Sequence, residues 1–392
     1  MDLYTLSLLA PAAVLVAAAA GFLNAGRRPE WVPQIAEGAA LAAVVAALAS
    51  GAVLAAKGPG TGEILGLMVR LDLLSVVMLL LVSFVGWVVL RYTRSYLDGE
   101  DRQGAFTGWM ALTLASVLTF VQAGHLGLFV VAFVATSIFL ERLLLFYPER
   151  VPARRAARKK FVTARLGDAA LITAAVLLYN GYATPQIGEI LAAARIGVTP
   201  DAALWAGGFL ALAALLKSAQ FPTHGWLTEV METPTPVSAL LHAGVINAGG
   251  FLLIRFADVL VLAPGVLAVL VMVGGFTALF GGLVMLTQPA VKTSLAWSTV
   301  AQMGFMILQC GLALFPLALL HIVAHSLYKA HAFLASGQAV EGVAAIRRPG
   351  PVAIPSGAAV LKAFVAALVI YGLVGAGFGF DGKSPQAIAL GA

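Results

Sequence analysis

The sequence has little charge and a single cysteine. Charged residues make up 11% of the 392 residues and hydrophobic residues 61%. Soluble domains contain about 25% charged residues, and disordered segments combine high charge with low hydrophobicity, so both classes are excluded. Because Cys310 stands alone, an intrachain disulfide and a cysteine-built metal or iron–sulfur site are excluded too. The composition is typical of an integral membrane protein.

Motifs for nucleotide or ester chemistry are also missing. Gly375, Gly377 and Gly379 form a GxGxG string, but it lies in an apolar run without a preceding strand, so it does not indicate a dinucleotide site. The net charge of +6 does not indicate nucleic acid, because basic residues in membrane proteins mainly set orientation. We therefore expect a transporter in contact with membrane lipid rather than an enzyme, with no cofactor of its own, whose chemistry is ion movement.

Apolar runs divide the chain into about twelve segments long enough to cross a bilayer, which takes about 20 residues. Charged residues, prolines and glycines separate them. The segments are roughly 3–23, 36–56, 71–91, 105–123, 125–147, 166–183, 203–231, 235–257, 262–286, 293–313, 315–338 and 353–377. We predict an all-α, polytopic helical bundle with about twelve transmembrane helices.

Basic residues fall mainly on one side of this topology. If the N-terminus lies outside, the inner loops hold 15 Lys and Arg residues and the outer loops five. Cytoplasmic loops carry such an excess, so we predict a multi-pass protein with its N-terminus outside. The basic run at 150–165 either orients the chain or docks an acidic partner or anionic lipid.

Lys217 lies near the middle of the predicted seventh span. An ionised group there costs about 2.5–3.5 kcal/mol on insertion scales, so such groups usually line ion paths. Pro222 follows about one turn later and should break the helix, and broken helices mark ion pathways in transporters. The alternative, that the Lys217 side chain extends to the membrane surface, fits poorly because the residue lies so far from either end of the span. We predict that Lys217 carries the ion.

The eleventh predicted span carries His321, His325 and Lys329 at successive i, i+4 positions, so they share one helix face. Histidine titrates near physiological pH, which favours a proton relay. Hydrogen bonding between helices is the alternative. Zinc is less favoured, because Ile322 stands where the HExxH motif has glutamate and no third ligand is evident.

His242 lies inside the eighth predicted span and belongs with Lys217, His321, His325 and Lys329 on the predicted ion path. Four further residues are weaker candidates for that path. Glu229 and Glu232 lie at the inner end of the seventh segment, where they either guard an inlet or are ordinary interfacial charges. Lys362 is either an outlet group or a lysine that reaches the surface. Glu141, in the fifth span, is a possible counter-charge for Lys217.

Several motifs resemble the antiporter-like subunits of respiratory complex I and of Mrp antiporters. They are KSAQFPTHGWL at 217–227, ETPTPVSALLH at 232–242, ARLGD at 164–168 and KTSLAWSTVAQMG at 292–304. The resemblance implies broken seventh and twelfth helices, and our prediction places the second break in the eleventh or twelfth segment. It also implies a buried line that moves protons, with Lys217 as the central lysine, His242 as the bridging residue and Lys329 as the next lysine.

The stretch HSLYKAHAFLASG at 325–337 resembles the DabB family, the membrane subunits of the DAB inorganic carbon pump. That resemblance implies a bacterial cytoplasmic membrane protein that pairs with a large peripheral zinc-dependent subunit similar to a β-carbonic anhydrase. The zinc and the hydration of CO2 to bicarbonate would belong to that partner. A complex I or hydrogenase-type proton pump, a Mrp-type antiporter and an inert membrane anchor are the alternatives.

Two departures from the family stand out. Relatives carry a glutamate early in the fifth span, whereas this chain has Ala132 and Phe133 there. Relatives also extend beyond twelve spans, which a shorter paralogue, a split gene or an incomplete sequence would all explain. We expect an N-terminal three-helix region at 1–104, an ion-translocating core at 105–345, and a C-terminal helix and tail at 346–392 that is cut short relative to the family.

Overall fold

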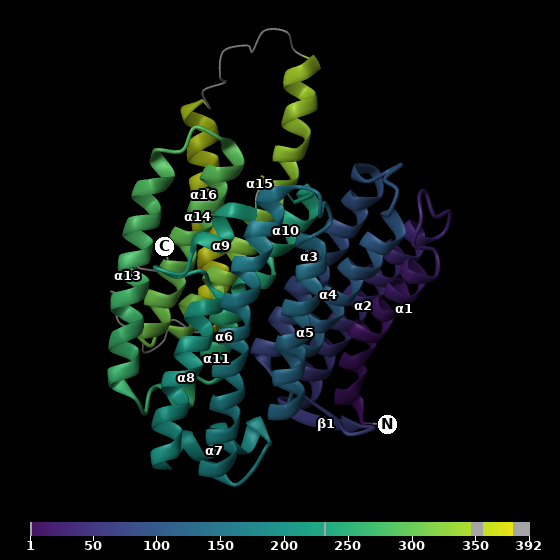
Figure 1. Ribbon diagram of the computed structural model, residues 1–392. Coiled ribbons are helices and arrows are strands. Elements are labelled where there is room, and N and C mark those ends of the chain that lie inside the picture. The colour runs from purple at the N-terminus through teal and green to yellow at the C-terminus, as the bar shows by residue number, and fades with distance from the viewer. Residues whose placement is uncertain (1, 231–232, 346–355, 379–392) are drawn as a thin grey trace.

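The computed structural model describes residues 2–230, 233–345 and 356–378. In these residues the chain forms a helical bundle with a small β-hairpin at one end (Figure 1). The elements are η1 (Leu3–Leu8), α1 (Leu9–Leu23), α2 (Val32–Lys57), β1 (Gly60–Ile64), β2 (Leu67–Leu71), α3 (Leu73–Tyr96), α4 (Gln103–Gln122), α5 (Leu126–Leu144), α6 (Val151–Tyr182), α7 (Ile187–Arg195), α8 (Asp201–Lys217), α9 (Gly225–Glu229), α10 (Thr235–Ala243), η3 (Val245–Asn247), α11 (Ala248–Arg255), α12 (Ala257–Leu260), α13 (Pro264–Leu286), α14 (Val291–Gly311), α15 (Phe315–Ala345) and α16 (Gly357–Phe378).

The predicted all-α polytopic class is confirmed. Within the described residues, nine helices are long and apolar enough to cross a membrane, and each of the twelve predicted segments overlaps helical structure. The hydrocarbon core of a membrane offers no hydrogen-bond partners to the backbone, whereas a helix pairs its own N–H and C=O groups. Apolar runs of this length therefore fold as helices. The count is below twelve in part because broken helices such as α8, with 17 residues, are too short to span alone.

The predicted break in the seventh segment is confirmed. Helix α8 ends at Lys217 and α9 begins at Gly225, on either side of Pro222, which cannot donate a backbone hydrogen bond. A second break, which the sequence did not indicate, separates α10 from α11 at residues 244–247.

The further break expected in the eleventh or twelfth segment does not occur in the described parts of those segments. Helix α15 is continuous from Phe315 to Ala345, and α16 from Gly357 to Phe378. The reason is local: the single proline of α15, Pro316, lies in the first turn, where a missing N–H is tolerated, and α16 contains no proline.

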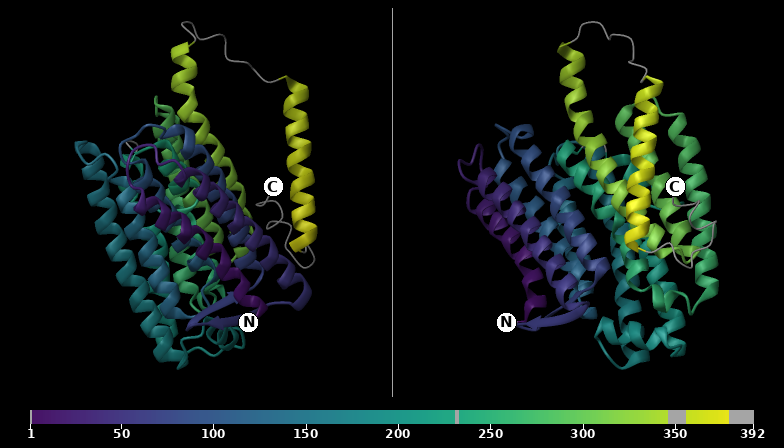
Figure 2. Two further views of the ribbon diagram at one scale, coloured as in Figure 1. Left: turned by 90° about the vertical axis from the view of Figure 1, so that its right-hand side faces the viewer. Right: turned by 180° about the vertical axis from the view of Figure 1, so that it is seen from behind.

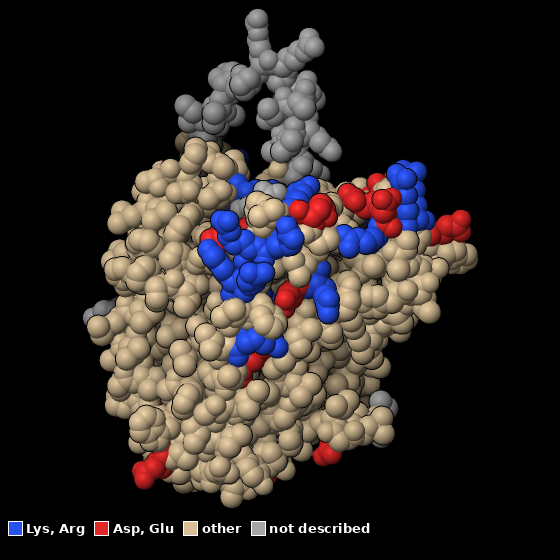
Figure 3. Space-filling model, viewed as in Figure 1, with Lys and Arg blue, Asp and Glu red and all other residues tan. Residues whose placement is uncertain are grey.

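The helices pack as neighbours around the two breaks. Helices α13 and α14 form one close pair, α6 and α8 another, and α10 packs on α15. Helix α16 lies at the edge of the bundle (Figure 2), with exposed side chains from Gly357 to Val369. On the face shown in Figure 3, Lys and Arg side chains gather toward one end of the bundle, and Figure 1 places the N-terminus at the other.

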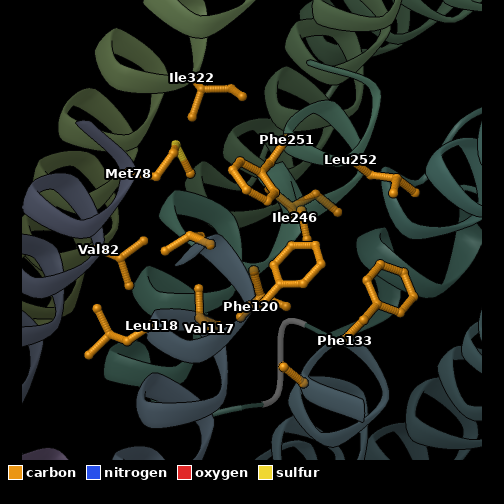
Figure 4. Packing of buried hydrophobic residues seen from close by; sticks show 14 of the residues in the cluster. Met78, Val82, Val117, Leu118, Phe120, Phe133, Ile246, Phe251, Leu252 and Ile322 are labelled. Carbon is orange, nitrogen blue, oxygen red and sulfur yellow. The ribbon is translucent and has the colours of Figure 1, made fainter. Parts of the chain in front are cut away.

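A phenylalanine cluster, defined here as Phe120, Phe129, Phe133, Phe251 and Phe256, fills the space between α4, α5 and α11. The ring centroid of Phe120 lies 4.5 Å from that of Phe129 and 5.0 Å from that of Phe251. Figure 4 shows three of these rings among the aliphatic side chains of α3, α4 and α11. Offset and edge-to-face contacts at these distances are favourable beyond simple burial, so the cluster fixes how the three helices meet.

The contact between α8 and α11 depends on Gly249. A Cβ atom at this position would lie 2.2 Å from Ser218 Oγ and 2.5 Å from the Ala214 carbonyl oxygen. Small residues allow helix backbones to approach closely in membranes. We expect Gly249→Ala to destabilise the protein by about 1–3 kcal/mol, measured as thermal unfolding in detergent. Gly208→Ala is the matched control on α8, because its Cβ would meet open space; equal losses in both variants would contradict this prediction.

Candidate functional site

Lys217 is buried at the point where α8 ends. Its side chain is 9% exposed, and Nζ donates a hydrogen bond of 2.5 Å to Ser137 Oγ on α5. Nζ also lies 4.0 Å from the centre of the Phe133 ring, in a cation–π geometry. A helix C-terminus carries partial negative charge, which stabilises a cation there. The break after Lys217 therefore places a lysine inside the bundle with few fixed partners.

A second buried lysine, Lys160, reaches the same serine. The basic run at 150–165 reads as a loop in the sequence, but α6 begins at Val151 and Lys160 is 5% exposed. Its Nζ donates to the Ser137 carbonyl oxygen at 2.5 Å. The buried residues Ala153, Ala156 and Ala157 precede it on α6, and this helical spacing of alanines within the basic run was the signal for a buried face.

Both lysines line one small cavity. It has a volume of about 20 Å³ and is bordered by Ser137, Trp226 and Ile246 as well, which is enough space for a water molecule. The indole nitrogen of Trp226 has no hydrogen-bond partner within the described residues. A water-sized cavity beside two lysines and a serine provides a place at the helix break where a lysine can exchange a proton.

Two carboxylates lie near this pair. Asp168, on α6, interacts electrostatically with both Lys217 and Lys160, and its carboxylate lies 2.5 Å from the Arg165 guanidinium. Glu141 interacts with Lys160. Glu141 is the counter-charge that the sequence suggests for Lys217, whereas Asp168 is not among the residues predicted for that role.

His242 lies in the interior between α10, α14 and α15. Its side chain is fully buried, Nδ1 lies 3.1 Å from Thr299 Oγ1, and the ring stacks on Phe333. The Thr299 hydroxyl donates to the Leu295 carbonyl oxygen, so it accepts from an Nδ1–H of His242. The other ring nitrogen, Nε2, has no partner in the described part of the chain and is free to take a proton.

The predicted polar face of α15 packs against this histidine. His325 Nε2 donates to the His242 carbonyl oxygen at 3.1 Å, and the His321 and His325 rings lie 5.9 Å apart. Lys329 is fully buried, and its Nζ donates to Ser298 Oγ at 2.8 Å and to the Leu295 carbonyl oxygen at 3.1 Å. His242 and Lys329 thus both bind residues within 295–299, about one turn of α14.

Polar groups at the break in residues 244–247 lie between the Lys217 and His242 clusters. Ser218 Oγ donates to the Ile246 carbonyl oxygen at 3.3 Å, and Asn247 Nδ2 donates to Ser326 Oγ on α15 at 2.9 Å. Asn247 Oδ1 is unpartnered within the described residues. Val245 borders both the lysine cavity and a second cavity beside Asn247 and Ser326. The second break therefore connects the two clusters.

The remaining predicted residues lie elsewhere. Glu229 forms an ion pair with Lys159 at the surface, and Lys362 is exposed on α16. Glu232 lies outside the described residues. Within the described ranges, no group of three or more His, Cys, Asp or Glu side chains is arranged to hold a metal ion.

Arg255 lies near the end of the predicted eighth segment and is the buried last residue of α11. Its Nη1 donates to Asp72 Oδ2 at 2.6 Å and its Nη2 to Ser75 Oγ at 2.7 Å. Arg70 also donates to Asp72, at 2.7 Å. This network ties α11 to the start of α3 at the end of the bundle that carries the β-hairpin.

Two family models match the chain. Residues 123–348 match the model described as NADH:quinone oxidoreductase/Mrp antiporter, TM, and residues 65–107 match NADH-Ubiquinone oxidoreductase (complex I), chain 5 N-terminus. The first match covers the helices that carry both clusters.

Individual relatives agree with these models. A protein of Hydrogenovibrio crunogenus named "Probable inorganic carbon transporter subunit DabB" is 46% identical over 71% of this chain and 54% of its own length. NADH-quinone oxidoreductase subunit L of Escherichia coli is 35% identical over 70% of this chain and 46% of its own length. This chain thus spans about half the length of these relatives. The Mrp complex structure from Dietzia sp. DQ12-45-1b matches with a TM-score of 0.74 and 28% identity, covering 86% of this chain and 38% of that one.

Proposed function

Because this chain belongs to the NADH:quinone oxidoreductase/Mrp antiporter family of membrane proteins, we propose that it translocates protons, with Na⁺ as the alternative ion. The proposed path contains Lys217, His242, His321, His325 and Lys329. The observation that carries the proposal is the buried polar line from Ser137 and Lys217 through the break at 244–247 to His325 and Lys329. An inert anchor would be more stable with apolar side chains at these positions.

The chemistry of the line suits protons. Lysine and histidine each hold or release one proton, and the free Nε2 of His242 accepts one without breaking the hydrogen bond at Nδ1. Hydroxyl and amide groups of Ser218, Asn247 and Ser326 offer hydrogen bonds between the clusters. Moving one charge through 100 mV releases about 2.3 kcal/mol, enough to bias a coupled reaction.

The DabB-like relative supports a specific use of this path. We propose that a cation gradient through this chain drives CO2 hydration and bicarbonate accumulation on a large peripheral partner. The partner would resemble a carbonic anhydrase and hold the zinc. The gathering of basic side chains at one end, away from the N-terminus, supports a bacterial cytoplasmic membrane location with the N-terminus outside (Figure 3).

The match to a complex I subunit and to a Mrp complex supports a second candidate. In that case the same path would serve a respiratory proton pump or a cation/proton antiporter, and the catalytic partner would be a redox arm or a set of antiporter subunits. The higher identity to the DabB relative, 46% against 35%, favours inorganic carbon transport.

Co-purification separates the two candidates. We expect the tagged chain, isolated from native membranes in mild detergent, to bring down one large zinc-containing protein, identified by mass spectrometry with zinc assayed on the same sample. Untagged membranes treated in the same way control for non-specific binding. Recovery of flavin or iron–sulfur subunits instead would contradict the carbon proposal and leave the proton path standing.

A further inference from the structure

Ser137 joins two buried lysines from different helices. Lys217, at the end of α8, donates to its hydroxyl, and Lys160, on α6, donates to its carbonyl oxygen, each at 2.5 Å. Both lysines line the same small cavity. Two ammonium groups this close repel each other, and burial adds to the cost of charging both.

The charges around the pair balance when one of the two lysines is neutral. From α6, Arg165 and Asp168 face the site, and Glu141 faces it from α5. Arg165 pairs with Asp168, so Glu141 is left to balance two amines. One excess positive charge inside a membrane protein is costly. A single proton on the two lysines removes that excess.

Lys160 also lies on the way from the basic surface to Lys217. The two residues before it on α6, Arg158 and Lys159, are exposed, whereas Lys160 is buried. One helix turn therefore leads from solvent-exposed basic side chains to the buried serine.

On these grounds we propose that Lys160 and Lys217 form a two-lysine site that shares one proton across Ser137, with Lys160 as the inlet to the path. A proton leaves the ammonium of one lysine and binds the free amine of the other, through Ser137 Oγ or a water in the cavity, so charge is conserved in each step. This inference rests on the proposed proton transport and adds Lys160 as an ion-translocating residue.

The test compares variants of the intact complex in proteoliposomes, with proton flux followed by an internal pH-sensitive dye. We expect Lys160→Met to lower the flux by about 10²-fold, the scale of a lost proton-transfer group. We expect Lys160→Arg to be equally slow, because a guanidinium does not release its proton. The matched control is Arg158→Gln, which removes one exposed positive charge from the same helix and should leave the flux within about twofold of wild type.

The arginine variant separates a relay from a structural role. If Lys160 merely anchors α6 to α5, Lys160→Arg should restore transport, and that result would overturn the proposal. Wild-type flux in Lys160→Met beside an inactive Lys217→Met would overturn it too, while leaving the main path intact. Wild-type flux in both variants would reject the path itself. If Lys160→Met fails to assemble, Ser137→Ala provides the test: loss of the bridging hydroxyl should slow the flux about tenfold, and an unchanged rate counts against the shared proton.

Discussion

Replacing Lys217 by methionine is expected to abolish transport, with a loss of about 10²-fold or more, while the complex still assembles. The amine that holds the proton between Ser137 and the break is lost, whereas the apolar stem that packs against Phe133 is largely kept. Because a charged group in a span costs about 2.5–3.5 kcal/mol, its removal should not weaken folding. Proton flux in proteoliposomes and inorganic carbon accumulation in cells are the measurements.

The control for this variant is Lys57→Met. Lys57 ends α2 at an exposed position, so the same change there should leave flux and assembly at wild-type values. Size-exclusion chromatography of both variants shows whether the complex is intact. Wild-type transport by an assembled Lys217→Met complex would rule out the proposed path.

The second large effect is expected from Asp72→Asn, as a loss of about 3–5 kcal/mol in the free energy of unfolding. Arg255 is 3% exposed. Without the carboxylate, the partners left to its guanidinium among the described residues are neutral: Ser75 Oγ, the Val121 carbonyl oxygen and the Phe251 ring. Arg70 is partly exposed and can turn to water. Thermal and denaturant unfolding in detergent measure the change.

Two further variants make this prediction specific. Asp98→Asn breaks the exposed ion pair with Arg28 and should cost at most about 1 kcal/mol. The double variant Asp72→Asn/Arg255→Met removes both charges and should recover much of the stability, because an unpaired buried charge is the main penalty. A double variant less stable than Asp72→Asn would show that Arg255 stabilises by packing rather than by its charge.

The sequence predicts those features that a single segment encodes. Lys217 and Pro222 stand out inside an apolar run, and the i, i+4 spacing of His321, His325 and Lys329 is visible without a structure. The predicted helical class and the seventh break followed from such local patterns, and both are present.

Features that depend on distant partners were missed. Lys160 lies in a run that reads as a basic loop, and its burial depends on the packing of α6 against α5. Arg255 stands at the end of an apolar run, like an ordinary boundary residue, until its pairing with Asp72 is known. The break at 244–247 contains a glycine but no proline, a weak signal within an apolar segment. The roles assigned to these residues remain proposals.

The phenylalanine cluster limits the directions in which a proton could leave Lys217 on the proposed path. Phe133 lies against the amine, and Phe120, Phe129, Phe251 and Phe256 follow toward the end where Arg255 binds Asp72. Phenyl rings offer no hydrogen-bond chain for a proton, so this side of the lysine is electrically insulated. The proposed polar route from Lys217 passes instead through the break at 244–247 to His325 and Lys329. On the proposed proton path, this arrangement would oppose passive leakage past the ring cluster and would link each transferred proton to the polar groups of the neighbouring helices.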